Sequence, residues 1–136
     1  MTTQYWLVKS DPEDYSWADL ARDGRADWTG VRNFAARGHL NAMRVGDRVL
    51  VYESGGPKAV AGIAEVARAA FPDATADEPG WVAVELKALE ALKTPVTLAQ
   101  IKATPALAKM ALLRLARLSV QPVTRAEFER VVKMGG

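Results

Sequence analysis

The stretch that most constrains the fold runs from residue 45 to residue 66. Two runs rich in β-branched residues, 45–54 and 59–66, flank the turn Gly-Gly-Pro-Lys at residues 55–58. Such runs on either side of a Gly-Pro turn predict a β-hairpin. Both runs are apolar at nearly every residue, so we expect both faces to be covered, as in a small closed or half-closed barrel. Gly62 inside the second run predicts a bulge, a bend or a closely approaching backbone.

Further strands and short helices are predicted on both sides of the hairpin. Strands are expected at residues 4–8, 81–87 and 118–122. Helices are expected after Ser16, Gly30, Thr97 and Thr124. Three of these starts have the spacing of a capping box, with Ser or Thr three residues before Asp, Gln or Glu. The pattern predicts an α+β fold, a mixed barrel-like sheet of about five or six strands with short flanking helices, in a single domain over residues 1–136.

The segment after Gly30 is expected to be helical to about Met43, with Phe34, Leu40 and Met43 available for burial. Together with the C-terminal third it should pack around the hairpin and leave a pocket beside it. Residues 71–80, rich in acids and prolines, should form an exposed loop.

The composition limits the classes of protein to which the chain can belong. Of 136 residues, 49% are hydrophobic and 25% charged, which is typical of a globular chain rather than a disordered one. The absence of cysteine excludes disulfides and thiolate metal sites, and with His39 as the one histidine a His/Cys zinc site is also excluded. The N-terminal residues have neither a basic region nor a long apolar stretch. We therefore expect a soluble, cytoplasmic protein with no metal and no cofactor.

Charge is distributed unevenly along the chain. Residues 1–68 hold nine basic and nine acidic side chains, residues 69–97 hold two and five, and residues 98–136 hold seven and two. The last segment therefore has a net charge of +5. This is compatible with a polyanionic partner, and equally with a solvated helical surface.

We find no catalytic motif in the sequence. Nothing matches a dinucleotide fingerprint or a P-loop, and the turn at residues 55–58 joins two strands, which favours a hairpin turn over a phosphate cradle. His39 is expected to pack rather than act as a base. The acids at positions 11, 13 and 14 are best explained as a solvated turn.

Other residues favour recognition of a nucleobase. Trp28 precedes a glycine turn and is followed by Arg32 and Asn33. An exposed indole can stack on a base, Asn can bond to a base edge, and Arg can hold phosphate or a base. The alternative is that Trp28 belongs to the core and the arginines to the surface. Polar residues at three predicted strand ends have the character of a rim around an apolar cavity: Lys9, Ser10, Tyr52, Ser54, Arg117 and Ser119.

Eight segments, in order and with compatible spacing over nearly the whole chain, resemble the EVE domain family. They are residues 5–12 (YWLVKSDP), 28–34 (WTGVRNF), 46–47 (GD), 52–54 (YES), 62–66 (GIAEV), 71–73 (FPD), 95–98 (PVTL) and 117–124 (RLSVQPVT). The resemblance implies a PUA-like fold and a pocket for a modified base, with methylated cytosine or adenine the usual suggestion. Trp28 would be a wall of that pocket. The other implied pocket residues are Lys9, Ser10, Val31, Arg32, Asn33, Tyr52, Ser54, Arg117 and Ser119.

The resemblance also implies a partner, DNA or RNA carrying a modified base, with Arg37 and Arg114 on its phosphates. The chain departs from the family pattern at four positions: Asp11, Phe34, Glu53 and Gly55. We expect a non-catalytic reader. The alternatives are an enzyme acting on a modified nucleotide with Glu53 as general base, and a structural or partner-binding module with a vestigial pocket.

Overall fold

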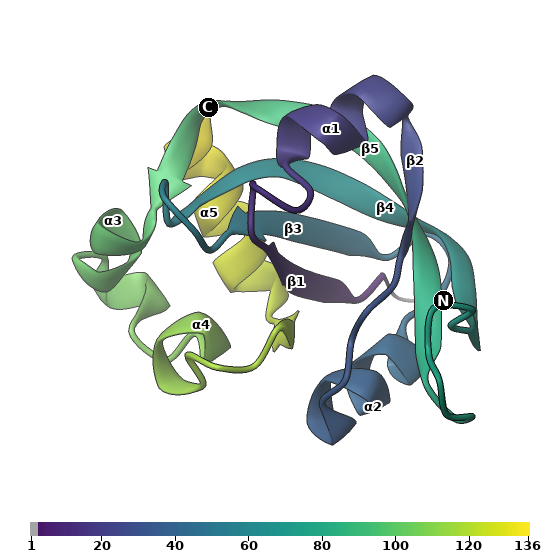
Figure 1. Cartoon of the computed structure of the whole chain (residues 1–136). Helices are drawn as coiled ribbons and strands as arrows, with labels where there is room; N and C mark the ends of the chain where they lie inside the picture. The colour runs from purple at the N-terminus through teal and green to yellow at the C-terminus, as the bar shows by residue number, and fades with distance from the viewer. Residues whose placement is uncertain (1–2) are drawn as a thin grey trace.

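The computed structural model describes residues 3–136, in which six strands form one mixed sheet (Figure 1). The strands are β1 (Tyr5–Ser10), β2 (Arg25–Trp28), β3 (Arg48–Glu53), β4 (Ala59–Pro72), β5 (Val82–Thr97) and β6 (Val120–Val123). Their order in the sheet is β2-β5-β4-β3-β1-β6. β1 pairs with β3 in parallel, and the other pairs are antiparallel. Since β2 and β6 are the edges, the sheet is not closed, which is the half-closed form of the expected barrel.

Residues 3–136 also form five short helices and one 3-10 turn, which connect the strands except for the C-terminal helix. They are α1 (Trp17–Asp23), α2 (Phe34–Ala42), α3 (Leu98–Lys102), α4 (Ala111–Arg114), α5 (Arg125–Gly135) and η1 (Pro105–Leu107). All three expected capping boxes are present, at Ser16, Thr97 and Thr124. Figure 1 shows the chain running from α1 through β2 to α2 along one side of the sheet, with α3 and α4 at the opposite side. The predicted α+β fold is confirmed. No helix within residues 3–136 is both long and apolar enough to cross a membrane.

The predicted hairpin is confirmed as β3 and β4, which pair antiparallel around the turn at residues 55–58. The register with β5 shifts between Val60 and Gly62, so the predicted bulge is also present. A Cβ at Gly62 would lie 2.3 Å from Cε2 of Trp17. Position 62 is therefore glycine because an indole lies directly on its backbone.

Apolar residues cover both faces of the sheet, as expected. Along β1, Trp6 and Val8 belong to one core cluster, and Leu7 belongs to the other. The buried carboxylate of Asp47 links the strands to one another by accepting hydrogen bonds from the Trp6 indole at 2.9 Å and the Gln4 amide at 3.0 Å. Both hydrogen bonds hold the start of β1 against the turn before β3.

Three sequence-based expectations need correction. Phe34 was expected to be buried with Leu40 and Met43, but its side chain is 71% exposed while the other two are buried. The first position of α2 faces solvent, and the buried stripe of the helix consists of Ala36 and Leu40. The edge strand β2 was not anticipated because Arg-Ala-Asp-Trp lacks a β-branched run. The strand expected at residues 81–87 continues to Thr97.

Candidate functional site

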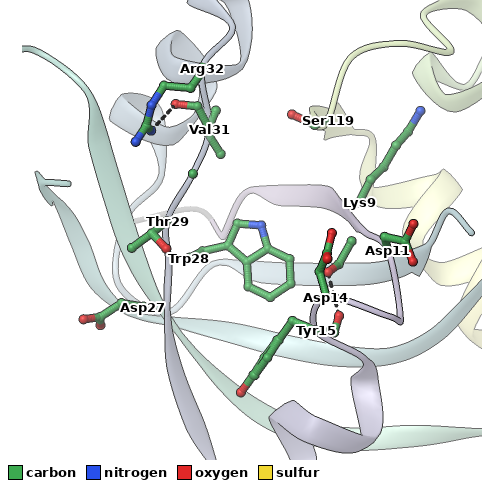
Figure 2. A pocket seen from close by; sticks show the side chains of 12 residues that line it. Lys9, Asp11, Asp14, Tyr15, Asp27, Trp28, Thr29, Val31, Arg32 and Ser119 are labelled. Atoms are coloured by element: carbon green, nitrogen blue, oxygen red, sulfur yellow. Dashed lines mark hydrogen bonds between the residues drawn. The ribbon is translucent and has the colours of Figure 1, made fainter. Parts of the chain in front are cut away.

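A cavity of about 470 Å³ opens where the carboxyl ends of β1 and β2 meet the loop before β6 (Figure 2). Its volume lies within the range of about 300–1,000 Å³ typical of small-molecule pockets. Three segments supply the lining: Lys9, Ser10, Asp11, Asp14 and Tyr15; Asp27, Trp28, Thr29, Gly30, Val31 and Arg32; and Ser119.

Trp28 forms a wall of this cavity while belonging to the core. Its side chain is 8% exposed and packs in the cluster that contains Trp17 and Leu20. The Tyr15 ring lies edge-on to it, with centroids 6.2 Å apart at 79°. Figure 2 shows the indole projecting from β2 toward the middle of the lining residues. Its Nε1–H has no hydrogen-bond partner among residues 3–136, so a rigid aromatic surface and one free donor face the cavity.

The segment after Trp28 is fixed by a buried carboxylate, Asp73. Its Oδ2 accepts from the Gly30 amide at 2.8 Å and from the Arg32 guanidinium at 2.9 Å. Its Oδ1 accepts from the amide and hydroxyl of Thr75 at 2.8 and 2.6 Å. Burial by itself would raise the pKa of Asp73, but these hydrogen bonds outweigh burial and hold that pKa well below its ordinary value. The ionised side chain therefore acts as a clamp on the cavity wall.

Lys9 and Ser10 reach the cavity from the end of β1. The Lys9 ammonium donates to the Ala116 carbonyl, and burial lowers the Lys9 pKa. The Lys9 amide donates to the Ser119 carbonyl at 2.9 Å, which brings the loop before β6 against the end of β1. The Ser10 hydroxyl donates to the Tyr15 carbonyl at 2.6 Å. These bonds fix the position of the polar rim without filling the cavity.

The lining is acidic in sum, with two cations against three carboxylates. Asp14 lines the cavity together with Trp28, and Figure 2 shows Asp27 directed away from the indole. Within residues 3–136, neither carboxylate makes a hydrogen bond or ion pair. In the same part of the chain, no group of three or more His, Asp or Glu side chains is arranged to hold a metal ion. A phosphate inside this cavity would meet net repulsion, whereas a neutral group with N–H donors would not.

The structure brings together six of the ten expected pocket residues. Lys9, Ser10, Trp28, Val31, Arg32 and Ser119 line the cavity. Asn33, Tyr52, Ser54 and Arg117 do not.

Each of these four has a different position. The Asn33 side chain caps α2 by accepting from the Ala36 amide at 2.9 Å. Tyr52 is buried in the core on the other face of the sheet, because side chains alternate along β3. Ser54 lies exposed after β3, and exposed Arg117 faces a shallow groove beside Asn33.

Three other residues singled out from the sequence make side-chain hydrogen bonds to the backbone of this chain. Arg37, expected on phosphate, donates to the Gly80 carbonyl at 3.1 Å from the surface of α2. Arg114, the other expected phosphate ligand, donates to the Lys109 carbonyl at 2.7 Å. Glu53 does not line the cavity. Its carboxylate accepts from the Trp17 amide at 3.0 Å, where it stabilises the amino end of α1.

Sequence reasoning missed several lining residues, among them Asp14, Tyr15, Asp27 and Thr29. Asp27 and Thr29 flank Trp28 directly, and this adjacency was the available signal. Nothing in the sequence placed Asp14 and Tyr15 beside Trp28, since β2 had not been anticipated. The role of Asp73 was also missed, although it lies in the segment Phe-Pro-Asp that carries part of the family resemblance.

The chain combines a half-closed mixed sheet with an aromatic-walled cavity at the ends of β1 and β2. The chain belongs to the EVE domain family, whose model matches residues 4–134, and its fold is PUA-like.

Three relatives are informative. A solved protein of Rhodopseudomonas palustris is 51% identical, with a TM-score of 0.93 over 98% of this chain and 94% of that one. Thymocyte nuclear protein 1 of Homo sapiens is 30% identical over 97% of this chain and 74% of its own length. The structure of human THYN1 protein in complex with DNA containing 5-methylcytosine is 29% identical, with a TM-score of 0.91 over 98% of each chain.

Proposed function

We propose that this protein binds nucleic acid that carries a modified base, and that the modified base enters the cavity beside Trp28. The observation that carries the proposal is the cavity itself, about 470 Å³, with one indole wall held rigidly by the core. The similar human THYN1 protein, solved with DNA that contains 5-methylcytosine, supports methylated cytosine in DNA as the first ligand to test.

The chemistry of the lining favours a base over a phosphate. A nucleobase is neutral, and its ring can stack on Trp28, which is worth about 1–3 kcal/mol per base. The Trp28 Nε1–H offers a donor to a ring nitrogen or carbonyl. The Asp14 carboxylate, which also lines the cavity, can accept from an exocyclic amino group, such as N4 of cytosine. A base inside a duplex must first leave its stack, at a cost of a few kcal/mol, so single-stranded ligands should bind more readily.

The proposed activity is binding without chemistry. Glu53, the general base of the alternative enzyme hypothesis, accepts from the amide of Trp17 and lies outside the cavity lining. Asp11 at the rim accepts from the Glu13 amide at 2.9 Å and so stabilises a turn. The lining therefore supports recognition, which needs fixed donors and acceptors and no proton transfer.

The experiment is a titration of the protein with matched oligonucleotides. They carry one central cytosine, 5-methylcytosine, adenine or N6-methyladenine, as DNA and as RNA, at two salt concentrations. We expect tighter binding of a methylated base, by about fourfold for one methyl group in apolar contact at roughly 0.8 kcal/mol. We expect weaker binding at higher salt. Equal affinity for all eight ligands, or no binding of any, would contradict the proposal.

A pair of matched variants tests the position of the ligand. Trp28→Ala would also remove a core side chain, at a cost of about 3–5 kcal/mol, so Trp28→Phe is the better probe. Trp17→Phe is its control, because Trp17 packs in the same cluster but does not line the cavity. We expect Trp28→Phe to weaken binding at least about fivefold and Trp17→Phe to change it less than about twofold. Similar affinities for the two variants would exclude the base from this cavity.

A further inference from the structure

Phe34, at the start of α2, is exposed beyond what packing explains. Its side chain is 71% exposed, compared with 64% for Val45, 46% for Leu115 and 41% for Leu89. It is the one aromatic residue among these large exposed apolar side chains of residues 3–136. A single exposed apolar side chain is common, so what matters is whether its neighbours form a surface with it.

Its neighbours do hold it in place. The Trp81 ring stacks on Phe34, with centroids 5.3 Å apart at 25°. The Arg37 guanidinium lies 4.8 Å from the Phe34 centroid and 4.9 Å from the Trp81 centroid. Arg37 also donates to the Gly80 carbonyl at 3.1 Å, which ties α2 to the segment that carries Trp81. We call Phe34, Trp81 and Arg37 the Phe34 platform.

The Phe34 platform is continuous with the cavity. Arg32 lines the cavity, and its guanidinium carbon lies 5.7 Å from the centroid of the Trp81 ring. Phe34 follows Val31, another lining residue, by three positions along the chain, a span of at most about 11 Å when fully extended. Successive bases along one strand are about 3.4 Å apart when stacked and farther apart when splayed. A strand with one base in the cavity can therefore place a neighbouring base at the platform.

The chemistry of the platform fits a nucleotide. Any nucleobase offers a π-face to an exposed aromatic ring, so stacking there is tolerant of sequence. The Arg37 cation beside the rings can attract the phosphate that joins two nucleotides. An apolar protein partner would gain from Phe34 but would have to desolvate this guanidinium without a counter-charge.

We propose that the Phe34 platform stacks the nucleobase next to the base that occupies the cavity, on the same strand. This proposal rests on the proposed function, and it adds a second contact that would not read the modification. It predicts that affinity depends on the presence of a flanking base.

The test compares two single-stranded DNA pentanucleotides with a central 5-methylcytosine. One has ordinary bases on both sides, and the other has abasic sugars there, so that the number of phosphates is equal. Phe34→Ala is the variant, and Val45→Ala is the control because it removes an apolar side chain that is also exposed. Thermal unfolding of each variant verifies the fold before binding is measured.

We expect Phe34→Ala to weaken binding of the intact pentanucleotide about 5- to 150-fold, the range for loss of one stacked base. We expect a change of less than about twofold for the pentanucleotide with abasic flanks, and for Val45→Ala with either ligand. An equal loss for both ligands, or no loss for either, would contradict stacking of a base on the Phe34 platform. The proposal for the cavity would be unaffected. If wild-type protein binds the methylated pentanucleotide no better than its unmethylated match, the proposed function fails and the platform with it.

Discussion

The Asp73 clamp should stabilise the fold as well as the cavity wall. Replacing Asp73 with alanine removes a fully buried carboxylate that accepts from Gly30, Arg32 and Thr75. Three donors, the Gly30 amide and the amide and hydroxyl of Thr75, lose their acceptor, whereas Arg32 keeps the Val31 carbonyl. An unsatisfied buried donor costs about 1–3 kcal/mol. These donors are partly accessible to water, and the Arg32 side chain is 37% exposed, so the lower end of that range applies to each.

The three losses add to about 3 kcal/mol, close to the 3–5 kcal/mol typical of breaking a buried pair. A protein of this size has a stability of roughly 5–15 kcal/mol, so the variant should still fold. At about 4 °C per kcal/mol, the melting temperature should fall by about 12 °C. Because Gly30 and Arg32 line the cavity, affinity for the methylated oligonucleotide should fall as well.

Urea and thermal unfolding measure the change in stability. Asp77→Ala is the control, since Asp77 lies exposed in the same loop and its loss removes the same charge. It should change stability by less than about 0.5 kcal/mol. If Asp73→Ala and Asp77→Ala destabilise equally, or if Asp73→Ala costs less than about 1 kcal/mol, the clamp does not hold the wall.

The clamp should also respond to pH in a defined direction. The folded-state pKa of Asp73 lies below its ordinary value of 3.8. A depressed carboxyl pKa contributes stability that is fully present above the unfolded pKa and is lost as pH falls through the folded pKa. The difference in unfolding free energy between wild type and Asp73→Asn should therefore be constant near neutral pH and shrink in acid below about pH 4. A difference that grows in acid would refute the assignment.

Two further pairs of substitutions test the fold and the surface. Gly62→Ala forces a methyl group against the Trp17 indole and should destabilise by about 1–3 kcal/mol in urea unfolding. Gly38→Ala, in α2 with open space at its Cβ, should instead stabilise by about 0.5–1 kcal/mol, and the opposite order of the two would refute the packing argument. Arg37→Gln should reduce the slope of log affinity against log salt by about 0.7 for single-stranded DNA, while Arg125→Gln, on α5, should leave it unchanged. Equal slopes for both variants and wild type would show that Arg37 does not contact a phosphate of the bound strand.

Local signals predicted those parts of the fold that depend on local chemistry. The three capping boxes depend on residues three apart, and the hairpin on two apolar runs around one turn. β2 was not predictable in this way. Its residues are polar apart from Ala26 and Trp28, and it is a strand because β5 offers an antiparallel partner along its length. The exposure of Phe34 was equally invisible, because an aromatic residue at a helix start has the same pattern whether it is buried or stacked on Trp81.

The site residues could likewise be predicted only where a local sequence signal indicated their position. Trp28, Lys9, Ser10 and Ser119 could be named because each stands at the end of a predicted strand or before a turn. Tyr52 was expected beside them because it also lies near a strand end. Its position two residues after buried Leu50 puts its ring on the face of the sheet away from Trp28. There it lies beside Lys9, its neighbour on β1, whose ammonium is 6.0 Å from the ring centroid.

The charges in and around the cavity suit two different functions of a nucleic-acid-binding protein, recognition of the base and binding of the phosphates. Inside the lining, two cations are outnumbered by three carboxylates, and one of those cations, Arg32, is already neutralised by Asp73. A phosphate gains nothing there, whereas a neutral ring with an amino group gains an acceptor and an aromatic wall. The phosphates must then be held outside the cavity, where Arg37 stands beside exposed Phe34. This arrangement makes affinity for the backbone and discrimination of the base separable. Mutations at Arg37 should therefore change salt dependence without changing the ratio of methylated to plain affinity, and Trp28→Phe should change that ratio without changing salt dependence.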